Sequence, residues 1–180
     1  LTPDVTEEIL AEILKSPESS FEARHGHACA IRRILAGGAQ VSAVEDLKKH
    51  VLNYLKDDKA AVREAGFAAL GATIGRAANP TSSLRSSEAE LFKVMKNTQE
   101  PMEIHRAVAR GLCVALVMID PNERVAFMGV KMMDACLQMS LKSIQRVQFA
   151  FNDVLWLALN VSDGTAGLDR YCNMTVFDNQ

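Results

Sequence analysis

The stretch from Asp57 to Gly75, DDKAAVREAGFAALGATIG, restricts the fold more than any other part of the chain. Two carboxylates open it, at a place where the free N–H groups and the positive dipole end of a helix favour negative charge. Apolar residues follow at helical spacing, at Val62, Ala65, Ala69 and Ile74. The small residues among them permit a second helix to approach closely. The stretch therefore predicts the second helix of a tightly packed helical hairpin.

Related stretches recur on both sides of this helix at a nearly constant spacing. ARHGHACAIRRIL begins at Ala23, 39 residues before Val62, and IHRAVARGLCVAL begins at Ile104, 42 residues after it. VQFAFNDVLWLAL begins at Val147, a further 43 residues along the chain. A period of this length with two helices in each unit is the signature of a solenoid built from stacked repeats.

Turn residues between the apolar segments divide the chain into four helical hairpins and a tail. We expect repeats at about 4–36, 43–77, 87–119 and 123–160, all within 1–161, and a tail over 162–180 in which Leu168–Cys172 forms a short helix. Asn79-Pro80 is predicted to end a helix, because proline cannot continue one. Residues 77–87 are then a polar loop, followed by a short helix over 88–96. No alternating strand pattern occurs, so the expected fold class is all-α.

Composition excludes several functional classes. The chain is 23% charged with a net charge of −2, which gives no overall signal for nucleic-acid or membrane binding. Its four cysteines are far apart and form no CxxC pair, as is typical of free thiols in a reducing compartment. The most apolar run, Ala107 to Ile119, is too short to span a bilayer. We therefore expect a cytoplasmic protein.

The stretch from Asp57 to Gly75 resembles the second helix of a HEAT repeat. The matching residues are Asp57, Asp58, Val62, Arg63 and the run Ala69-Leu70-Gly71. The resemblance implies a right-handed α–α superhelix of the HEAT/ARM type, with a ladder of Asp and Arg side chains between neighbouring repeats. In this sequence the ladder residues are Asp57, Asp58, Arg24 and Arg63. His105 and Gln148 stand in the arginine position of the last two repeats, so the ladder is not expected to continue there.

A narrower resemblance covers most of the chain. FEARHGH over Phe21–His27, LKDDKAAVREAGFAALG and the closing RVQFAFNDVLWLALNVSDG are similar to the C-terminal repeats of the giant HEAT-repeat translational activators of general amino-acid control. This resemblance implies a non-catalytic, ribosome-associated scaffold in starvation signalling. Its protein partners would be the ribosome and the stress-response kinase that phosphorylates initiation factor two. No contact residue is transferred from the family.

Two other functional classes remain open. One is a generic HEAT/ARM adaptor, such as a transport receptor, a microtubule-binding array or a phosphatase scaffold. A tubulin binder is expected to carry Trp or Lys in the first loop within a repeat, whereas that loop here reads SPESS. The other class is an all-α enzyme. Asp57 and Asp58 are adjacent and point apart at a helix start, and no GxSxG or phosphate-loop motif occurs, so we predict no catalytic residue.

The remaining polar groups give one candidate surface and no predicted cofactor. His25 and Cys29 share a helix face, but no second ligand pair lies near them in sequence, so we predict helix packing rather than a metal site. Basic side chains in the first two repeats form a candidate binding surface for ribosomal RNA phosphates, with solvated helix faces as the alternative. They are Arg32, Arg33, Lys48, Lys49 and Lys56. Met128, Met132, Met133 and Met139 are expected in the core.

Overall fold

The computed structural model describes residues 3–15, 20–39 and 41–159, and these residues form an all-α fold. Within those ranges the helices are α1 (Pro3–Lys15), α2 (Phe21–Ala36), α3 (Val44–Tyr54), α4 (Ala60–Arg76), α5 (Pro80–Lys96), α6 (Met102–Val117), α7 (Arg124–Lys142) and α8 (Gln145–Leu159), with a short 3₁₀ helix, η1 (Pro121–Glu123). The prediction of an all-α chain is confirmed. The expected tail over 162–180 lies outside the described residues.

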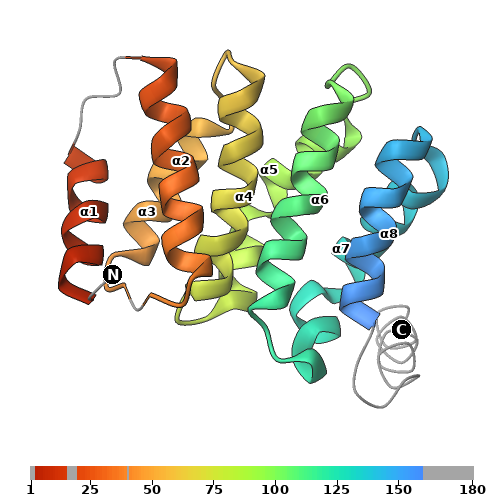
Figure 1. Ribbon diagram of the computed structural model, residues 1–180. Coiled ribbons are helices and arrows are strands. Elements are labelled where there is room, and N and C mark those ends of the chain that lie inside the picture. The colour runs from red at the N-terminus through yellow and green to blue at the C-terminus, as the bar shows by residue number, and fades with distance from the viewer. Residues whose placement is uncertain (1–2, 16–19, 40, 160–180) are drawn as a thin grey trace.

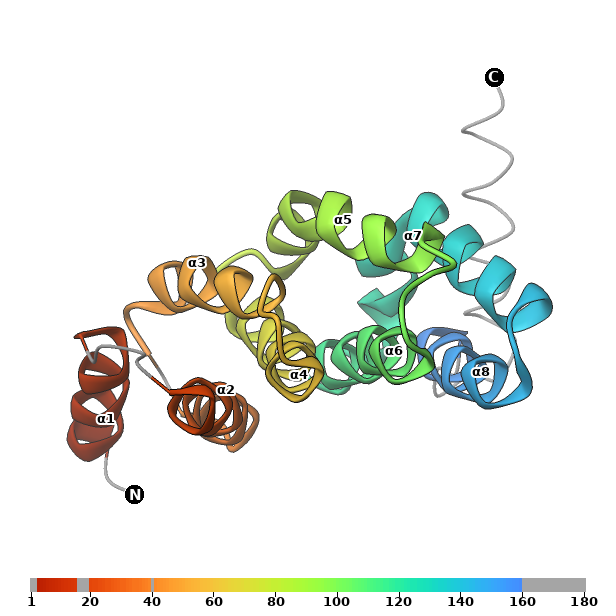
Figure 2. The same cartoon turned by 90° about the horizontal axis from the view of Figure 1, so that it is seen from above.

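The helices form two layers (Figures 1 and 2). The second helices of the hairpins, α2, α4, α6 and α8, stand side by side in one row. Within this row α4 packs against both α2 and α6, and α6 packs against α8. The first helices α3, α5 and α7 form the other layer, and α1 lies at the end of the stack (Figure 2), where it contacts both α2 and α3. Figure 2 shows the row of second helices on the inner side of a curved stack, and we call it the inner row.

The start of α5 corrects the predicted loop over 77–87. Asn79 is the N-cap of this helix, and its side-chain oxygen accepts a hydrogen bond from the Ser82 backbone N–H at 2.9 Å. Pro80 occupies the first turn, where its fixed φ suits a helix and its missing N–H costs nothing. The Asn-Pro pair therefore begins a helix instead of ending one. The third hairpin starts at Pro80, not near residue 87, and Ser83, Leu84 and Ser87 are buried.

Glycines set the spacing between neighbouring helices. A Cβ atom on Gly71 of α4 would lie 1.9 Å from the backbone carbonyl oxygen of Gly111 in α6. A Cβ atom on Gly111 would in turn lie 2.3 Å from the carbonyl oxygen of Phe67. Gly66 similarly faces Tyr54 of α3, where an added Cβ would lie 3.0 Å from the tyrosine Cβ. The small residues of α4 thus permit close packing on two of its sides.

Helix α7 is interrupted at Gly129, whose φ of 66° and ψ of 165° are not helical. This positive φ favours glycine over other residues. Arg85 of α5 lies against the break and donates hydrogen bonds to the carbonyl oxygens of Phe127 at 3.0 Å and Met128 at 2.8 Å. It also pairs with Glu88. Arg85 is therefore a contact between hairpins, whereas the sequence pattern predicted a loop residue.

The core runs continuously through both layers. Met128, Met132 and Met133 are buried within it, as expected, and Met139 is half-buried. Among the described residues, none of the helices is long and apolar enough to cross a membrane.

Candidate binding groove

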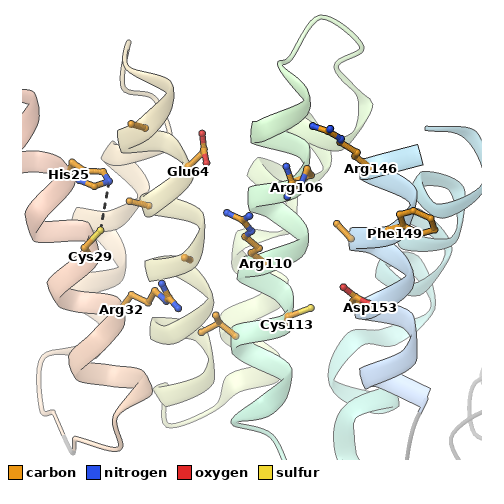
Figure 3. A pocket seen from close by; sticks show the side chains of 15 residues that line it. His25, Cys29, Arg32, Glu64, Arg106, Arg110, Cys113, Arg146, Phe149 and Asp153 are labelled. Atoms are coloured by element: carbon orange, nitrogen blue, oxygen red, sulfur yellow. Dashed lines mark hydrogen bonds between the residues drawn. The ribbon is translucent and has the colours of Figure 1, made fainter. Parts of the chain in front are cut away.

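A groove of about 980 Å³ runs across the inner row, and all four of its helices contribute side chains (Figure 3). The lining residues are His25, Cys29 and Arg32 from α2; Ala61, Glu64, Ala65 and Ala68 from α4; Arg106, Arg110, Cys113 and Val114 from α6; and Arg146, Phe149, Ala150 and Asp153 from α8. Each helix supplies residues spaced by three or four positions, which is the spacing of a single helix face. The groove therefore follows from the side-by-side packing of equivalent faces.

Equivalent repeat positions carry different chemistry in the groove. When the four second helices are aligned at their repeat spacing, His25, Glu64, Arg106 and Phe149 occupy one position. One turn further along, Cys29, Ala68, Arg110 and Asp153 occupy another. The packing positions of the same helices instead keep small or apolar residues. The groove is thus the surface on which the repeats differ from one another.

The groove carries more positive than negative charge. Arg32, Arg106, Arg110 and Arg146 line it, against the two carboxylates of Glu64 and Asp153. In the part of the chain that the structure describes, none of these four guanidinium groups forms an ion pair or hydrogen bond with another side chain. Arg110 and Arg146 are exposed, and Arg106 is half-buried. These donors are therefore free to bind an anionic group from outside the chain.

Two thiols, Cys113 in the groove and Cys136 in the core, have raised pKa values. Burial, with a smaller contribution from the charge of Asp153, raises the pKa of Cys113 to about 11. Burial also raises the pKa of Cys136, which is fully enclosed. Since the thiolate is the reactive form, both side chains are unreactive at neutral pH. Cys29 Sγ lies 3.8 Å from His25 Nε2, and no group of three or more His, Cys, Asp or Glu suited to a metal is found among the described residues.

The residues named for the ladder lie on the edge where the hairpins turn, away from the groove. Arg24 of α2 donates from Nε to Asp57 Oδ2 at 2.5 Å and from Nη2 to Asp57 Oδ1 at 3.3 Å. Its Nη2 also lies 3.6 Å from Asp58 Oδ1. The hydrogen bond from Arg24 lowers the pKa of Asp57, although burial acts in the opposite direction. This pair joins the first hairpin to the second.

Arg63 continues the series to the third hairpin. It donates to the carbonyl oxygen of Asp57 at 2.8 Å, and its Nη2 lies 3.5 Å from Glu100 Oε2, in the turn before α6. His105, at the equivalent position of the next repeat, instead contacts the carbonyl oxygen of Val94 in its own hairpin at 3.1 Å. Arg24 and Arg63 thus link the first three hairpins.

The basic side chains predicted as one surface are dispersed in the structure. Arg32 lines the groove, whereas Arg33 is exposed outside it. Lys49 pairs with Asp46 at 3.0 Å, and Lys56 is exposed in the turn after α3.

The prediction for Lys48 is wrong, because this side chain is buried. Its ammonium group donates to the carbonyl oxygen and hydroxyl of Ser83, both at 2.8 Å, and to Ser86 Oγ at 2.6 Å. Burial lowers the pKa of Lys48, with Glu45 opposing the shift. The lysine therefore links α3 to α5, and its ammonium group is already bonded within the protein.

Sequence reasoning missed the groove residues Arg106, Arg110 and Arg146. The signal was present, because Arg106 and Arg110 stand one turn apart at the repeat positions of His25 and Cys29. Comparison with protein-family models, with curated proteins and with solved structures gave no match. The groove and the repeat pattern are therefore the observations from which a function can be proposed.

Proposed function

We propose that the protein is a non-catalytic scaffold, a right-handed superhelix of four HEAT-like hairpins that binds macromolecular partners along its inner row. The repeat spacing of about 39 to 43 residues supports this proposal, as do the parallel stacking of α2, α4, α6 and α8 and the contact between Arg24 and Asp57. The observation that carries it is the groove itself. Its arginines form no ion pair or hydrogen bond with another described side chain, and their positions differ from repeat to repeat.

The geometry of the groove favours binding over catalysis. His25 and Cys29 resemble a base and a nucleophile, but they stand four positions apart on the exposed face of one helix. The groove walls are the sides of helices, where the backbone N–H groups are already bonded within each helix. Such walls supply no pair of free N–H donors to stabilise an oxyanion. A scaffold role requires neither of these groups.

The translational role rests on the resemblance of FEARHGH and of the last repeat to the giant activators of general amino-acid control. On this proposal the protein works in the cytoplasm, associates with ribosomes and helps to activate the stress-response kinase. The alternative is a generic HEAT/ARM adaptor that serves transport, microtubules or a phosphatase. Both functions use the same stack, and they differ in the partner.

Sedimentation of the protein with ribosomes tests the translational role. We expect comigration with ribosomes in a sucrose gradient at low salt, and loss of that comigration at moderate salt, because contacts to phosphates are screened. The comparison uses wild-type protein and a Lys131→Gln variant, which changes an exposed side chain of the outer layer. Failure of the wild type to comigrate at low salt would reject the translational role in favour of the adaptor.

A further inference from the structure

We infer that the groove binds an acidic segment of a protein partner, with carboxylates against Arg106 and Arg110 and an apolar side chain against Phe149. This inference rests on the proposed scaffold function and names the class of ligand that the scaffold would take. Three features support it, namely the charge of the groove, the chemistry of its α8 end and the spacing of the helices.

The two central arginines are placed for carboxylates. Arg106 and Arg110 stand four residues apart on one face of α6, in the middle of the groove. Side chains with this spacing lie about 5–6 Å apart at their Cβ atoms. Neighbouring side chains of an extended segment point to opposite sides, so a segment that crosses α6 can direct two consecutive carboxylates to Arg106 on one side and Arg110 on the other. Guanidinium groups also bind carboxylates in a planar, two-point geometry.

The α8 end of the groove is aromatic. Phe149 lines the groove and is 59% exposed, which is unusual for a phenylalanine in the middle of a helix. Trp156 lies seven positions further along α8 and is 63% exposed. The spacing of seven places both on one helix face, together with Asp153. A partner side chain that covers Phe149 would remove this apolar surface from water, which stabilises the complex.

The carboxylates in the groove favour a protein ligand over a nucleic acid. Glu64 lies in the floor of the groove at the repeat position of Arg106, and Asp153 lies at that of Arg110. A phosphate backbone carries a negative charge on every nucleotide and would meet these two carboxylates with repulsion. A protein segment can place an acidic residue against Arg106 and a neutral or basic residue against Glu64.

The stack sets the length of the segment. Neighbouring packed helices lie about 8–10 Å apart, so crossing from α2 to α8 covers about 24–30 Å. An extended chain advances about 3.3 Å per residue, which gives about eight or nine residues in the groove. The apolar residue for Phe149 would then follow the acidic residue for Arg106 by about three positions.

Fluorescence anisotropy with a labelled peptide tests this inference directly. The probe is a fluorescein-labelled peptide of about ten residues that is rich in Glu and carries one Phe. Two matched peptides replace every Glu by Gln or the Phe by Ser, and a labelled oligouridylate of the same length represents RNA. The proteins are the wild type, Arg106→Gln/Arg110→Gln, Glu64→Gln, Phe149→Ser and the control Lys131→Gln, each checked for an unchanged helical circular dichroism spectrum.

The inference predicts effects of opposite sign. The double arginine variant should weaken binding of the acidic peptide by about tenfold at low salt, whereas Glu64→Gln should tighten it by about threefold. Phe149→Ser should weaken the Phe peptide several-fold and leave the Ser peptide unaffected, and Lys131→Gln should match the wild type. Absence of binding to the wild type, or equal binding by the double variant, would overturn the inference. Tighter binding of oligouridylate, lost in the double variant, would assign the groove to RNA instead.

The peptide assay and the ribosome assay test different claims, so failure of the groove assignment can be distinguished from failure of the translational role. Ribosome comigration that survives Arg106→Gln/Arg110→Gln, with no peptide binding by the wild type, would reject the groove as an acidic-segment site and leave the scaffold function standing. Peptide binding without ribosome comigration would keep the groove assignment and reject the translational role.

Discussion

Gly71 of α4 and Gly111 of α6 meet backbone to backbone at the centre of the inner row. A Cβ atom added to Gly71 would lie 1.9 Å from the Gly111 carbonyl oxygen and 2.7 Å from its carbonyl carbon. Real Cβ atoms do not approach a backbone this closely, and a backbone cannot rotate aside as a long side chain can. The contact between the second and third hairpins therefore depends on the absence of a side chain at this position.

Gly71→Ala is expected to destabilise the protein by at least about 2 kcal/mol, because α4 and α6 must separate to admit the methyl group. The measurement is urea unfolding followed by circular dichroism. Gly26→Ala is the matched control, since a Cβ there would meet nothing within 4 Å. It should stabilise the protein by about 0.5–1 kcal/mol, as alanine is the better helix former. Equal shifts of the two variants would contradict the close contact.

Arg85→Ala is expected to lower stability by about 1–3 kcal/mol, because it removes the donors that satisfy the Phe127 and Met128 carbonyl oxygens beside the break in α7. The loss should be comparable to that of Arg63→Ala, which breaks the contacts to Asp57 and Glu100. Thermal unfolding of both variants, with the exposed Lys93→Ala as control, provides the comparison. A melting temperature for Arg85→Ala equal to that of the control would show that the Arg85 hydrogen bonds to α7 do not contribute to stability.

Asp57→Asn should make the protein less sensitive to acid. The bond from Arg24 lowers the pKa of Asp57 in the folded state. The Arg24–Asp57 pair therefore makes its full contribution to stability above the ordinary Asp pKa of about 4. This contribution is lost as the pH falls through the lower pKa that Asp57 has in the folded protein. Melting temperatures measured from about pH 7 to about pH 3 should fall further for the wild type than for the variant. Parallel curves would indicate that the pair does not affect acid stability.

Lys48→Met should remove a rise in stability at alkaline pH. Burial lowers the pKa of Lys48, so the unfolded chain holds the proton up to a higher pH than the folded protein does. The free energy of unfolding therefore rises with pH between the pKa of Lys48 in the folded protein and the ordinary lysine pKa of about 10.4. Methionine fills a similar volume, and Ser86 Oγ still donates to the Ser83 carbonyl oxygen at 2.9 Å.

The Lys48→Met comparison uses urea unfolding at about pH 7 and about pH 9.5. At neutral pH we expect the variant to equal or exceed the wild type in stability, because a desolvated cation is replaced by an apolar side chain. The gain on moving to alkaline pH should be smaller in the variant than in the wild type. An equal gain in both would place the alkaline effect elsewhere in the chain.

The helical class and the spacing of the second helices could be predicted because both depend on local patterns. Apolar residues at helical spacing repeat every 39 to 43 positions, and the burial of Val62, Ala69 and Ile74 follows from that pattern. Arg24 and Asp57 are 33 positions apart, but the repeat motif names both residues, and the structure places them in contact. In a repeat protein, a contact between residues far apart in sequence can be predicted when both residues belong to the repeat motif.

The start of α5 and the fate of Lys48 could not be predicted in the same way. Asn79-Pro80 is compatible with the end of one helix and with the start of the next, and the sequence pattern alone does not choose between them. Lys48 lies between Val44 and Val51 on the buried face of α3, where a long lysine side chain ordinarily carries its ammonium group out to solvent. Only the packing of α5 against α3 brings the Ser83 and Ser86 oxygens to its ammonium group.

The groove was missed for a different reason. Its residues are identifiable as a surface only when the four second helices are known to lie side by side, because no two neighbouring repeats carry the same chemistry there. Arg106 and Arg146 are 40 positions apart and belong to separate helices. At the repeat spacing Arg106 aligns with Phe149, and Arg146 lies one turn before Phe149 on the same helix face, so the repeat alignment is what places the two arginines on one surface. Basic residues that are adjacent in sequence, such as Lys48 and Lys49, give no indication of this surface.

The glycine contact between α4 and α6 also governs how a partner would be bound. It fixes the distance between the helix that carries Glu64 and the helix that carries Arg106 and Arg110 before any ligand arrives. The floor of the groove is therefore preorganised, and the entropy lost on binding is confined to the side chains and to the incoming segment. An arginine in this groove therefore contributes more binding free energy than the same arginine on a loop, because the helix that carries it is already held in place and loses little conformational entropy on binding.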